Sequence, residues 1–594
     1  MANGFGSLYV GASGLRGSQN ALNVAANNLS NLDTKGYVRQ QTFFVDDNYV
    51  KFATASISDQ AQGLGVQIGD VIHTRDQFLD ASYRKENGRH AFYAAGYEAA
   101  IEVETLLQEG AGESFSSSIE GLYQAFNEFA KDPNQEEVEN LVVQKASMFI
   151  SRAKAVNKGM SDYQLNINEK IRDDVNRINQ LSKTIYQLNV EIQRTEAGKV
   201  ETAMAARDAR DQVLDELSKL ASISYDENVD GIVRVKIEGQ PFVDVDRVYK
   251  IEMYEDKATG FVLPYWPQLS DVNRGGYYEV FNTKNVDPTK NTDIGEIKSL
   301  LLARGDHKAT YQDMIHLTSA QYDMGLSKSI MMNEQAELDL MIHSMIEQVN
   351  QYLSPVETLS DTKYGQKLID DGFISTDPAN PTTVFVDGKE LTITQNTVVL
   401  DEDNCCLGND REMPPKELFS RRNTERYTKV TLSNAAGETK DLYVYNEEDP
   451  EDTATLYTLD ELEANKALVE QPGFIPHVHQ NDNIAYDVAQ NIYDLWNKDG
   501  FTLNPSDKTP CSFENFYAKM CGELADAGSV YKTTSESLEM TRDQIESSRQ
   551  GVIGVNADEE LTDMIKYQNA YNASSRYINV VSAMIDTLIN SMGR

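Results

Sequence analysis

The chain of 594 residues is too long for a single hydrophobic core, because cores stop growing near ~250–300 residues and longer chains divide into domains. Its formal net charge of −39 opposes binding to a phosphate backbone, so we expect no nucleic-acid partner. No stretch of the sequence approaches the ~18 consecutive apolar residues of a membrane helix, so we expect no membrane insertion.

An apolar pattern near the start of the chain predicts a helix over residues 7–31. Its apolar positions alternate in steps of four and three, which places them on one face as in a coiled coil. These seam positions are Leu8, Ala12, Leu15, Gln19, Leu22, Ala26 and Leu29. Several asparagines on the same segment are poor helix formers, so we expect this helix to be weak on its own.

The end of the chain repeats this spacing. The matching positions are Ala557, Leu561, Met564, Gln568, Tyr571, Ser575, Ile578, Ser582, Ile585, Leu588 and Met592. We therefore predict a terminal coiled-coil domain formed by residues 1–75 with 557–594. We also expect both helices to become ordered only on assembly, because thin seams cannot offset an ordering cost of ~1–2 kcal/mol per residue.

The middle of the chain contains long helical patterns, of which the clearest runs from Ile167 to Ile192. These patterns predict a helical domain of antiparallel hairpins over residues 76–222 with 294–353 and 481–556.

Two segments interrupt this helical domain with alternating, strand-like patterns. Residues 223–293 include "GIVRVKIEG" and predict a small β-rich domain. Residues 354–480 include "YTKVTLS" and "DLYVYN" and predict an acidic, β-rich inserted outer domain. We expect the insertion to be self-contained, so that deletion of 356–478 leaves assembly intact.

The predicted fold class is therefore mainly α with β insertions. The chain is expected to be elongated and multidomain, with paired N- and C-terminal helices, a long helical-bundle domain and one or two central β-rich domains. The chain ends are expected at one pole and the insertions at the other.

The sequence contains none of the motifs HExxH, GxxxxGK[ST] or GxSxG, so we expect no enzyme, no cofactor and no metal site. His477 and His479 could point the same way from a strand, but no third ligand follows at metal-binding spacing, and two loop histidines are the simpler interpretation. The four cysteines are interpreted as incidental buried thiols, and their redox state stays open; they are Cys405, Cys406, Cys511 and Cys521.

A family resemblance begins in the first helix. The string "GLRGSQNALNVAANNLSNLDTKGYVRQ" resembles the N-terminal signature shared by flagellar rod, hook and first hook-associated proteins. Its most specific letters are AANNLSN at 25–31, followed by Thr34, Gly36 and Tyr37. The C-terminal string "GVNADEELTDMIKYQNAYNASSRYINVVSAMIDTLIN" resembles the matching end of the same group.

The long helices of residues 76–222 favour one member of that group. A rod or hook protein is expected to turn to β structure soon after its N-terminal helix, whereas this chain contains long helices there. The segments "RDARDQVLDELSKLASI" and "GEIKSLLLARGD" also resemble the first hook-associated protein (FlgK) family.

The resemblance implies a structural subunit at the hook-filament junction that is needed for filament assembly and motility. It implies flagellar type III export without a cleavable signal peptide and an extracellular position. It also implies a homo-oligomeric ring that contacts hook protein on one side and the second hook-associated protein on the other, and a flagellar export chaperone.

The expected assembly interface consists of seam residues and two signature asparagines. An ordinary intramolecular core is the alternative for these residues. They are Leu15, Leu22, Asn27, Asn28, Leu29, Leu561, Met564, Ile578, Ile585 and Leu588.

Two other functions stay open at this point. The chain could be another axial protein of the hook or rod type. Alternatively, the insertion 354–480 could act as an adhesin or glycan-binding module, for which an exposed cluster of Tyr427, Tyr443, Tyr445 and Tyr457 would be evidence.

Overall fold

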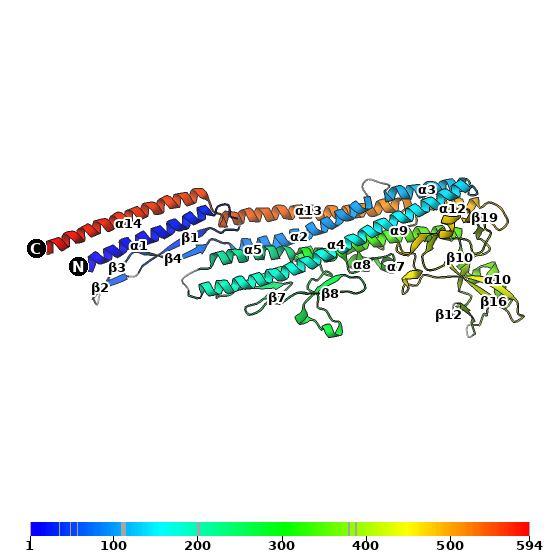
Figure 1. The fold of residues 1–594 in the computed structure, drawn as a ribbon, viewed down its shortest axis with the longest axis horizontal. Coiled ribbons are helices and arrows are strands. Elements are labelled where there is room, and N and C mark those ends of the chain that lie inside the picture. Colours follow the sequence, from blue (N-terminus) through cyan, green and yellow to red (C-terminus); the bar gives the residue numbers. More distant parts are fainter. Residues whose placement is uncertain are drawn as a thin grey trace.

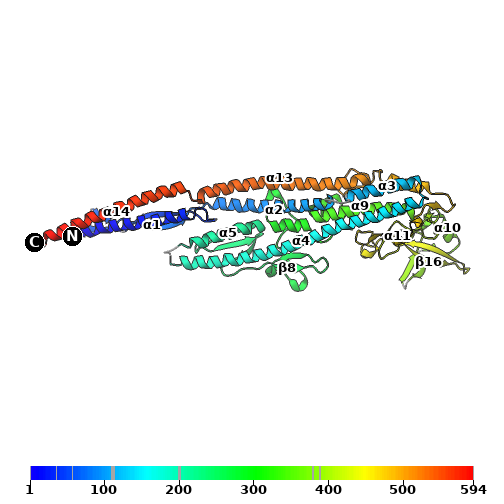
Figure 2. The same cartoon turned by 45° about the horizontal axis from the view of Figure 1, so that its top comes forward.

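The computed structural model describes residues 2–34, 36–47, 49–55, 58–108, 114–198, 202–377, 380–386 and 389–592. The described chain forms a long rod with both chain ends at one tip and the β elements of residues 354–480 at the other (Figure 1). The view turned by 45° shows the same rod (Figure 2). The predicted class, mainly α with β segments in an elongated multidomain chain, is confirmed.

The α-helices of the described chain differ widely in length, and α4 with 61 residues is ~90 Å long at 1.5 Å per residue. They are α1 (Ala2–Ser30), α2 (Gln77–Gln108), α3 (Phe115–Lys131), α4 (Glu136–Glu196), α5 (Met204–Leu220), α6 (Glu296–Arg304), α7 (Gln312–Ile315), α8 (Ser319–Met324), α9 (Ile330–Leu353), α10 (Lys363–Asp370), α11 (Lys466–Glu470), α12 (Tyr486–Leu495), α13 (Phe513–Ile553) and α14 (Ala557–Met592).

The strands form small antiparallel sheets. They are β1 (Gln40–Asp46), β2 (Tyr49–Ala55), β3 (Ser58–Gly63), β4 (Val66–His73), β5 (Ile223–Glu227), β6 (Val233–Ile237), β7 (Gln240–Val243), β8 (Glu252–Glu255), β9 (Val262–Tyr265), β10 (Val356–Thr358), β11 (Thr382–Val386), β12 (Lys389–Ile393), β13 (Val398–Leu400), β14 (Cys406–Leu407), β15 (Phe419–Arg421), β16 (Tyr427–Ser433), β17 (Thr439–Tyr445), β18 (Leu462–Ala464) and β19 (Val478–His479).

The terminal module consists of α1, α14 and strands β1–β4, and α1 and α14 lie antiparallel along each other (Figure 1). β1 pairs with β4, with an irregularity between Phe43 and Phe44, and β2 pairs with β3. The chain turns to β structure directly after α1, as we expected of rod and hook proteins, and the long helices predicted over residues 76–222 follow these strands. The pattern was missed because β1 is largely exposed and lacks an apolar alternation.

The helical body is built around α4, with α2 lying along α13 and with α3, α5, α6 and α9 packed beside them (Figure 2). The predicted helical stretch 294–353 is not continuous, because α6, α7, α8 and α9 are separated by turns. Residues 496–512 between α12 and α13 are likewise irregular. Breaks of this kind let short helices fill the space between the long ones.

Three buried asparagines of α4 hold the β segment 223–293 against the helix. The Asn179 amide donates to the Ile251 carbonyl at 2.8 Å, and the Ile251 N–H donates to the Asn179 Oδ1 at 3.0 Å. Asn189 makes the same two bonds with Val233, at 2.8 and 3.1 Å. Asn168 accepts from the Val262 N–H at 2.8 Å. The asparagine side chains thus bond to backbone groups of the β segment as a neighbouring strand would. The apolar residues of this β segment belong to the main core and do not form a separate one.

The insertion 354–480 divides into two parts. One part has its own core around the four-stranded sheet β10-β13-β17-β16. The other part contributes fully buried side chains to the main core of the helical body, namely Leu418, Phe419, Leu462, Leu468 and Ile475. The expectation of one self-contained unit is therefore wrong, and the exact domain boundaries stay predictions.

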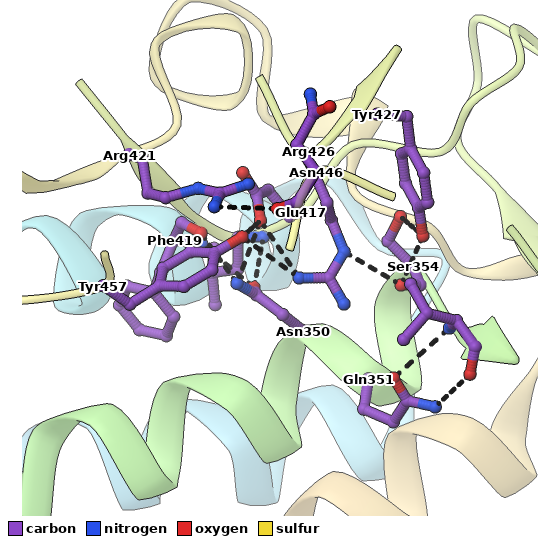
Figure 3. Close-up of polar contacts among 12 residues, drawn as sticks. Asn350, Gln351, Ser354, Glu417, Phe419, Arg421, Arg426, Tyr427, Asn446 and Tyr457 are labelled. Atoms are coloured by element: carbon purple, nitrogen blue, oxygen red, sulfur yellow. Dashed lines mark hydrogen bonds and ion pairs between the residues drawn. The ribbon is translucent and has the colours of Figure 1, made fainter. Parts of the chain in front are cut away.

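A buried polar cluster attaches the two parts of the insertion to the end of α9 (Figure 3). The Arg426 guanidinium donates to the Ser354 carbonyl at 3.1 Å and lies 3.4 Å from the Glu417 carboxylate. The same carboxylate oxygen accepts from the Tyr457 hydroxyl at 2.7 Å and from the Asn350 amide at 3.1 Å. Because the buried charges are paired and hydrogen-bonded, the cluster can fix the insertion without an uncompensated ion.

Candidate assembly surface

The two terminal helices approach closely because α1 presents small residues to α14. A Cβ atom at Gly11 would lie 2.6 Å from Ile578 Cγ1, and one at Gly14 would lie 2.8 Å from Ser574 Oγ. The other buried positions that follow Gly11 at this spacing are Ser18, Ala21, Ala25 and Asn28, whereas buried Gly17 faces Phe44 and Val66 of the strands. Side chains at these positions are short enough for the two helix backbones to come together.

The leucine seam predicted on α1 lies beside this contact face. Leu15, Leu22 and Leu29 are half-buried, whereas Ala21 and Asn28, one position before the last two leucines, are buried. The four-and-three spacing holds for both sets, so the pattern alone could not separate them. The close approach of backbones at glycine and alanine decided which face packs.

The predicted residues of α14 separate into two groups. Met564, Ile578 and Ile585 are half-buried, and Ile578 lies directly against α1. Leu561 and Leu588 are 46% and 52% exposed. The structure therefore leaves the second group available for contacts with other chains.

Exposed large apolar side chains gather on the terminal module. We call this set the terminal apolar surface. On α14 it comprises Leu561, Ile565, Tyr577, Val580, Met584, Leu588 and Ile589, and elsewhere in the module Tyr9, Phe43, Phe44, Val45, Tyr49 and Ile72. Concentrated exposed apolar area of this kind marks a protein interaction site.

A group of signature residues connects α1, β1 and α14. Asn28 is 1% exposed, its amide donates to the Gln40 carbonyl at 2.9 Å, and its Oδ1 accepts from the Gln40 N–H at 3.0 Å and the Tyr37 hydroxyl at 2.8 Å. The Asn28 amide also donates to Glu560 at 3.1 Å, and Arg39 donates to Glu560 at 2.7 Å. We call these five residues the signature latch.

The hydrogen bonds of the signature latch require that Tyr37 stays protonated, and the turn before Tyr37 requires a glycine. Burial, and then the charges of Asp208 and Glu560, raise the pKa of Tyr37 to about 12, so its hydroxyl stays a donor. Gly36 has a positive φ of 81°, and a Cβ atom there would overlap the Gln212 side chain of α5. Glycine is therefore required where this turn meets the helical body.

The structure corrects the expectation for one signature asparagine. Asn28 was predicted at a subunit interface, but its burial and its bonds place it inside the chain, where it fixes the joint of the terminal module. Asn27 is exposed, and its amide lies 3.3 Å from the Tyr37 hydroxyl. Sequence reasoning missed the roles of Glu560 and Arg39, although both residues lie within the two signature strings.

We expected two loop histidines in the HVH segment, but His479 lies in strand β19 and His477 is buried. His477 is 1% exposed, between the Ile475 carbonyl at 2.8 Å and the Asn134 side chain at 3.1 Å, and burial lowers its pKa. His479 pairs across β14 and β19 with Cys406. Within the described residues no three His, Cys, Asp or Glu side chains are grouped to hold a metal ion, and all four cysteines are free thiols.

The tyrosines considered for glycan binding do not form an exposed platform. Tyr427 and Tyr457 are 8% and 3% exposed, and Tyr443 and Tyr445 are half-buried. Tyr427 and Tyr457 instead bond to the cluster around Arg426 (Figure 3). No helix of the described chain has the length and apolar character of a membrane span.

Three family models match the chain. The model of the flagellar hook-associated protein FlgK helical domain matches residues 100–368. The model of the flagella basal body rod protein matches residues 8–37, and that of the flagellar basal body rod FlgEFG protein C-terminal region matches residues 549–592. Both ends and the helical body are thus covered by flagellar models.

Curated relatives align over almost their whole length. Flagellar hook-associated protein 1 of Bacillus subtilis is 23% identical, over 100% of this chain and 99% of the relative. The proteins of the same name from Salmonella typhimurium and Escherichia coli are 23% and 21% identical, each over 97% of this chain and 98% of the relative. A solved flagellar hook junction protein FlgK from Burkholderia pseudomallei is 14% identical, with a TM-score of 0.44 over 79% of this chain and 100% of that one.

Proposed function

The chain belongs to the family of flagellar hook-associated protein 1, and we propose that it is the structural adaptor at the hook-filament junction of a bacterial flagellum. The observation that carries this proposal is the match to the hook-associated helical domain over residues 100–368 together with full-length alignment to hook-associated proteins 1. The two end models alone would fit rod proteins as well, so the helical body separates the hook-associated family from the rod and hook types.

Packing, and not catalysis, is the proposed mechanism. The terminal apolar surface is buried by neighbouring subunits in a homo-oligomeric ring, by hook protein on one side and by the second hook-associated protein on the other. Full burial of one Leu or Ile contributes roughly 1.5–3 kcal/mol, so the seven exposed apolar residues of α14 supply a large driving force.

The predicted interface residues divide into three groups that take different parts in this mechanism. Leu561 and Leu588 contact other subunits directly, because they are exposed in the single chain. Half-buried Leu15, Leu22 and Leu29 lie at the edge of the α1-α14 pair and extend the same surface, whereas Met564, Ile578 and Ile585 hold the pair together.

Export precedes this assembly. The subunit leaves the cell through the flagellar type III apparatus without a cleavable signal peptide, and an export chaperone shields the terminal apolar surface beforehand. Exposed apolar area on a protein that must not assemble early is a reason for such a chaperone.

Electron microscopy of purified hook-filament preparations tests the proposal. An antibody label or an epitope in an exposed loop of the insertion should mark one narrow band between hook and filament. A strain without the gene should produce hooks without filaments, and the intact gene should restore them. Label along the whole hook or filament, or normal filaments in the deletion strain, would overturn the proposal.

A further inference from the structure

A cluster of carboxyl groups lies where α9 meets α13 and the loop of residues 498–511 between α12 and α13. Glu334 and Glu337 of α9 are 3% and 0% exposed. The loop contributes Asn504, which is buried, and α13 contributes Glu523. None of these residues belongs to the terminal module, so the proposed adaptor mechanism leaves the cluster without a role.

Asn504 connects the loop to both helices. Its amide donates to Glu337 Oε1 at 3.0 Å and to Glu523 Oε2 at 3.3 Å. Its own Oδ1 accepts from the backbone N–H groups of Ser506 and Asp507, at 3.2 and 3.1 Å. One side chain therefore fixes the turn of the loop and holds it on the two carboxyl groups.

Each carboxyl group of α9 has one oxygen without a partner. The Oε2 atoms of Glu334 and Glu337 are buried and have no hydrogen-bond partner among the described residues. A buried carboxylate is costly unless a cation or donors compensate it, so the stable buried form of these groups is the neutral one. In agreement with this, burial raises the pKa of both Glu334 and Glu337.

The surroundings of the two carboxyl groups are mostly acidic. Lys519 of α13 is the one cation of this group in the described chain, and it is already paired with Asp507. No charge from the other helices packed on α9 is among the main influences on Glu334 or Glu337 in the part of the chain that the structure describes. The facing titratable groups are Tyr322 of α8, Asp507 of the loop, Lys519, Cys521 and Glu523 of α13, and Glu104 of α2 beside Cys521.

The loop 498–511 is the part of this contact that can open. It is irregular, and its buried apolar side chains are Phe501 and Leu503. Trp496 and Phe513 flank it, are each 1% exposed and pack together, with ring centroids 4.9 Å apart. The loop can therefore leave α9 while its two ends stay anchored, as in a local opening of the native state.

We propose that Glu334, Glu337 and Asn504 form a proton-operated clamp, which holds the loop 498–511 on α9 while the two carboxyl groups are protonated and releases it when they ionise. The closed form holds protons that the open, hydrated form gives up. The clamp is therefore closed at low pH and opens as the pH rises above the ordinary range of a carboxyl group. Like charges on Glu334, Glu337 and Glu523 would then repel one another around a single bridging amide.

Hydrogen exchange of the purified full-length chain, measured by mass spectrometry, is the first test. Protection factors of residues 500–511 should fall by at least about tenfold between about pH 6 and about pH 9, the range in which buried glutamates ionise. Protection factors are used because they are corrected for the intrinsic effect of pH on exchange. Residues 171–185 of α4 should stay equally protected and serve as the internal control. Equal protection of the loop at both pH values would overturn the proposal.

Glu337→Gln is the decisive variant, because the amide keeps an acceptor for Asn504 but cannot ionise. Its loop should stay protected at the higher pH. Glu347→Gln is the matched control, since Glu347 is exposed on the same helix, and it should open as the wild type does. Loop opening in Glu337→Gln as large as that of the wild type would contradict the clamp.

Two more variants separate the clamp from a general loss of stability. Asn504→Ala removes the bridging amide, so its loop should be unprotected already at the lower pH. Glu334→Gln removes the neighbouring charge and should move loop opening to higher pH; it decides the question if Glu337→Gln loses protection in residues 171–185 and is thus misfolded. A protected loop in Asn504→Ala, or an unchanged opening pH in Glu334→Gln, would overturn the assignment. These readouts use the monomer, so their failure leaves the adaptor role untouched.

Discussion

Replacement of one of the three buried asparagines of α4 should weaken the attachment of the β segment 223–293 to the helical body. Asn179→Leu keeps the branched shape of the side chain but removes both bonds to Ile251, which is 0% exposed. A buried polar group that loses its partner costs about 1–3 kcal/mol. Because the Ile251 N–H and carbonyl both lose a partner, we expect a loss of roughly 2–6 kcal/mol in the free energy of unfolding of this segment.

Denaturant unfolding of the purified chain measures this effect. Trp266 lies in the same segment, is 0% exposed and packs against Phe242, so its fluorescence should report the loss of packing. Hydrogen exchange at residues 248–265 gives an independent reading of the same opening. Asn176→Leu is the matched control, because Asn176 is exposed on the same helix. A shift for Asn179→Leu no larger than that for Asn176→Leu would refute the idea that the asparagines hold the β segment.

Four further outcomes are expected. Leu588→Asp should leave the stability of the monomer unchanged within about 0.5 kcal/mol, since Leu588 is 52% exposed, and should reduce the number of filaments. The control Asn590→Asp adds the same charge at a nearby exposed position and should leave filament numbers unchanged. Fewer filaments from both variants would mean that charge alone is responsible. Residues 2–34 and 560–592 should exchange hydrogens rapidly in the monomer and slowly in isolated flagella, and strong protection in the monomer would exclude ordering on assembly. Burial raises the pKa of Glu337, and also that of its neighbour Glu334, so the folded state holds a proton that the unfolded state releases and stability should fall as the pH rises above the ordinary range of a carboxyl group. Glu337→Gln should flatten this part of a melting-temperature profile, and an unchanged slope would contradict the assignment. Deletion of 356–478 should lower the melting temperature of the helical body, because it removes fully buried Phe419 and Leu462 from the main core, and an unchanged melting curve would show that the helical body folds without them.

The sequence predicted both terminal helices in the right places. The spacing over residues 7–31 corresponds to α1, and the spacing from Ala557 to Met592 corresponds to α14. Periodicity is a local property, so helices of this length are visible without any tertiary information. The two end signatures are similarly local, which is why the family could be recognised before the fold was described.

The strands β1–β4 and the joint could not be predicted in this way. β1 shows no apolar alternation, since most of its side chains are exposed. The latch unites Asn28 and Tyr37 with Glu560 across more than 500 positions of sequence, and no spacing rule connects them.

Only the tertiary structure decided which surfaces are inside. Gly11 and its small neighbours share their spacing with Leu15, Leu22 and Leu29, and the close contact with Ile578 selected the small residues for the interior. The sequence by itself determined that two amphipathic helices exist and that their ends belong to one family. The choice between two adjacent faces depends on how near the helix backbones can approach, a quantity that exists only once α1 and α14 are packed together.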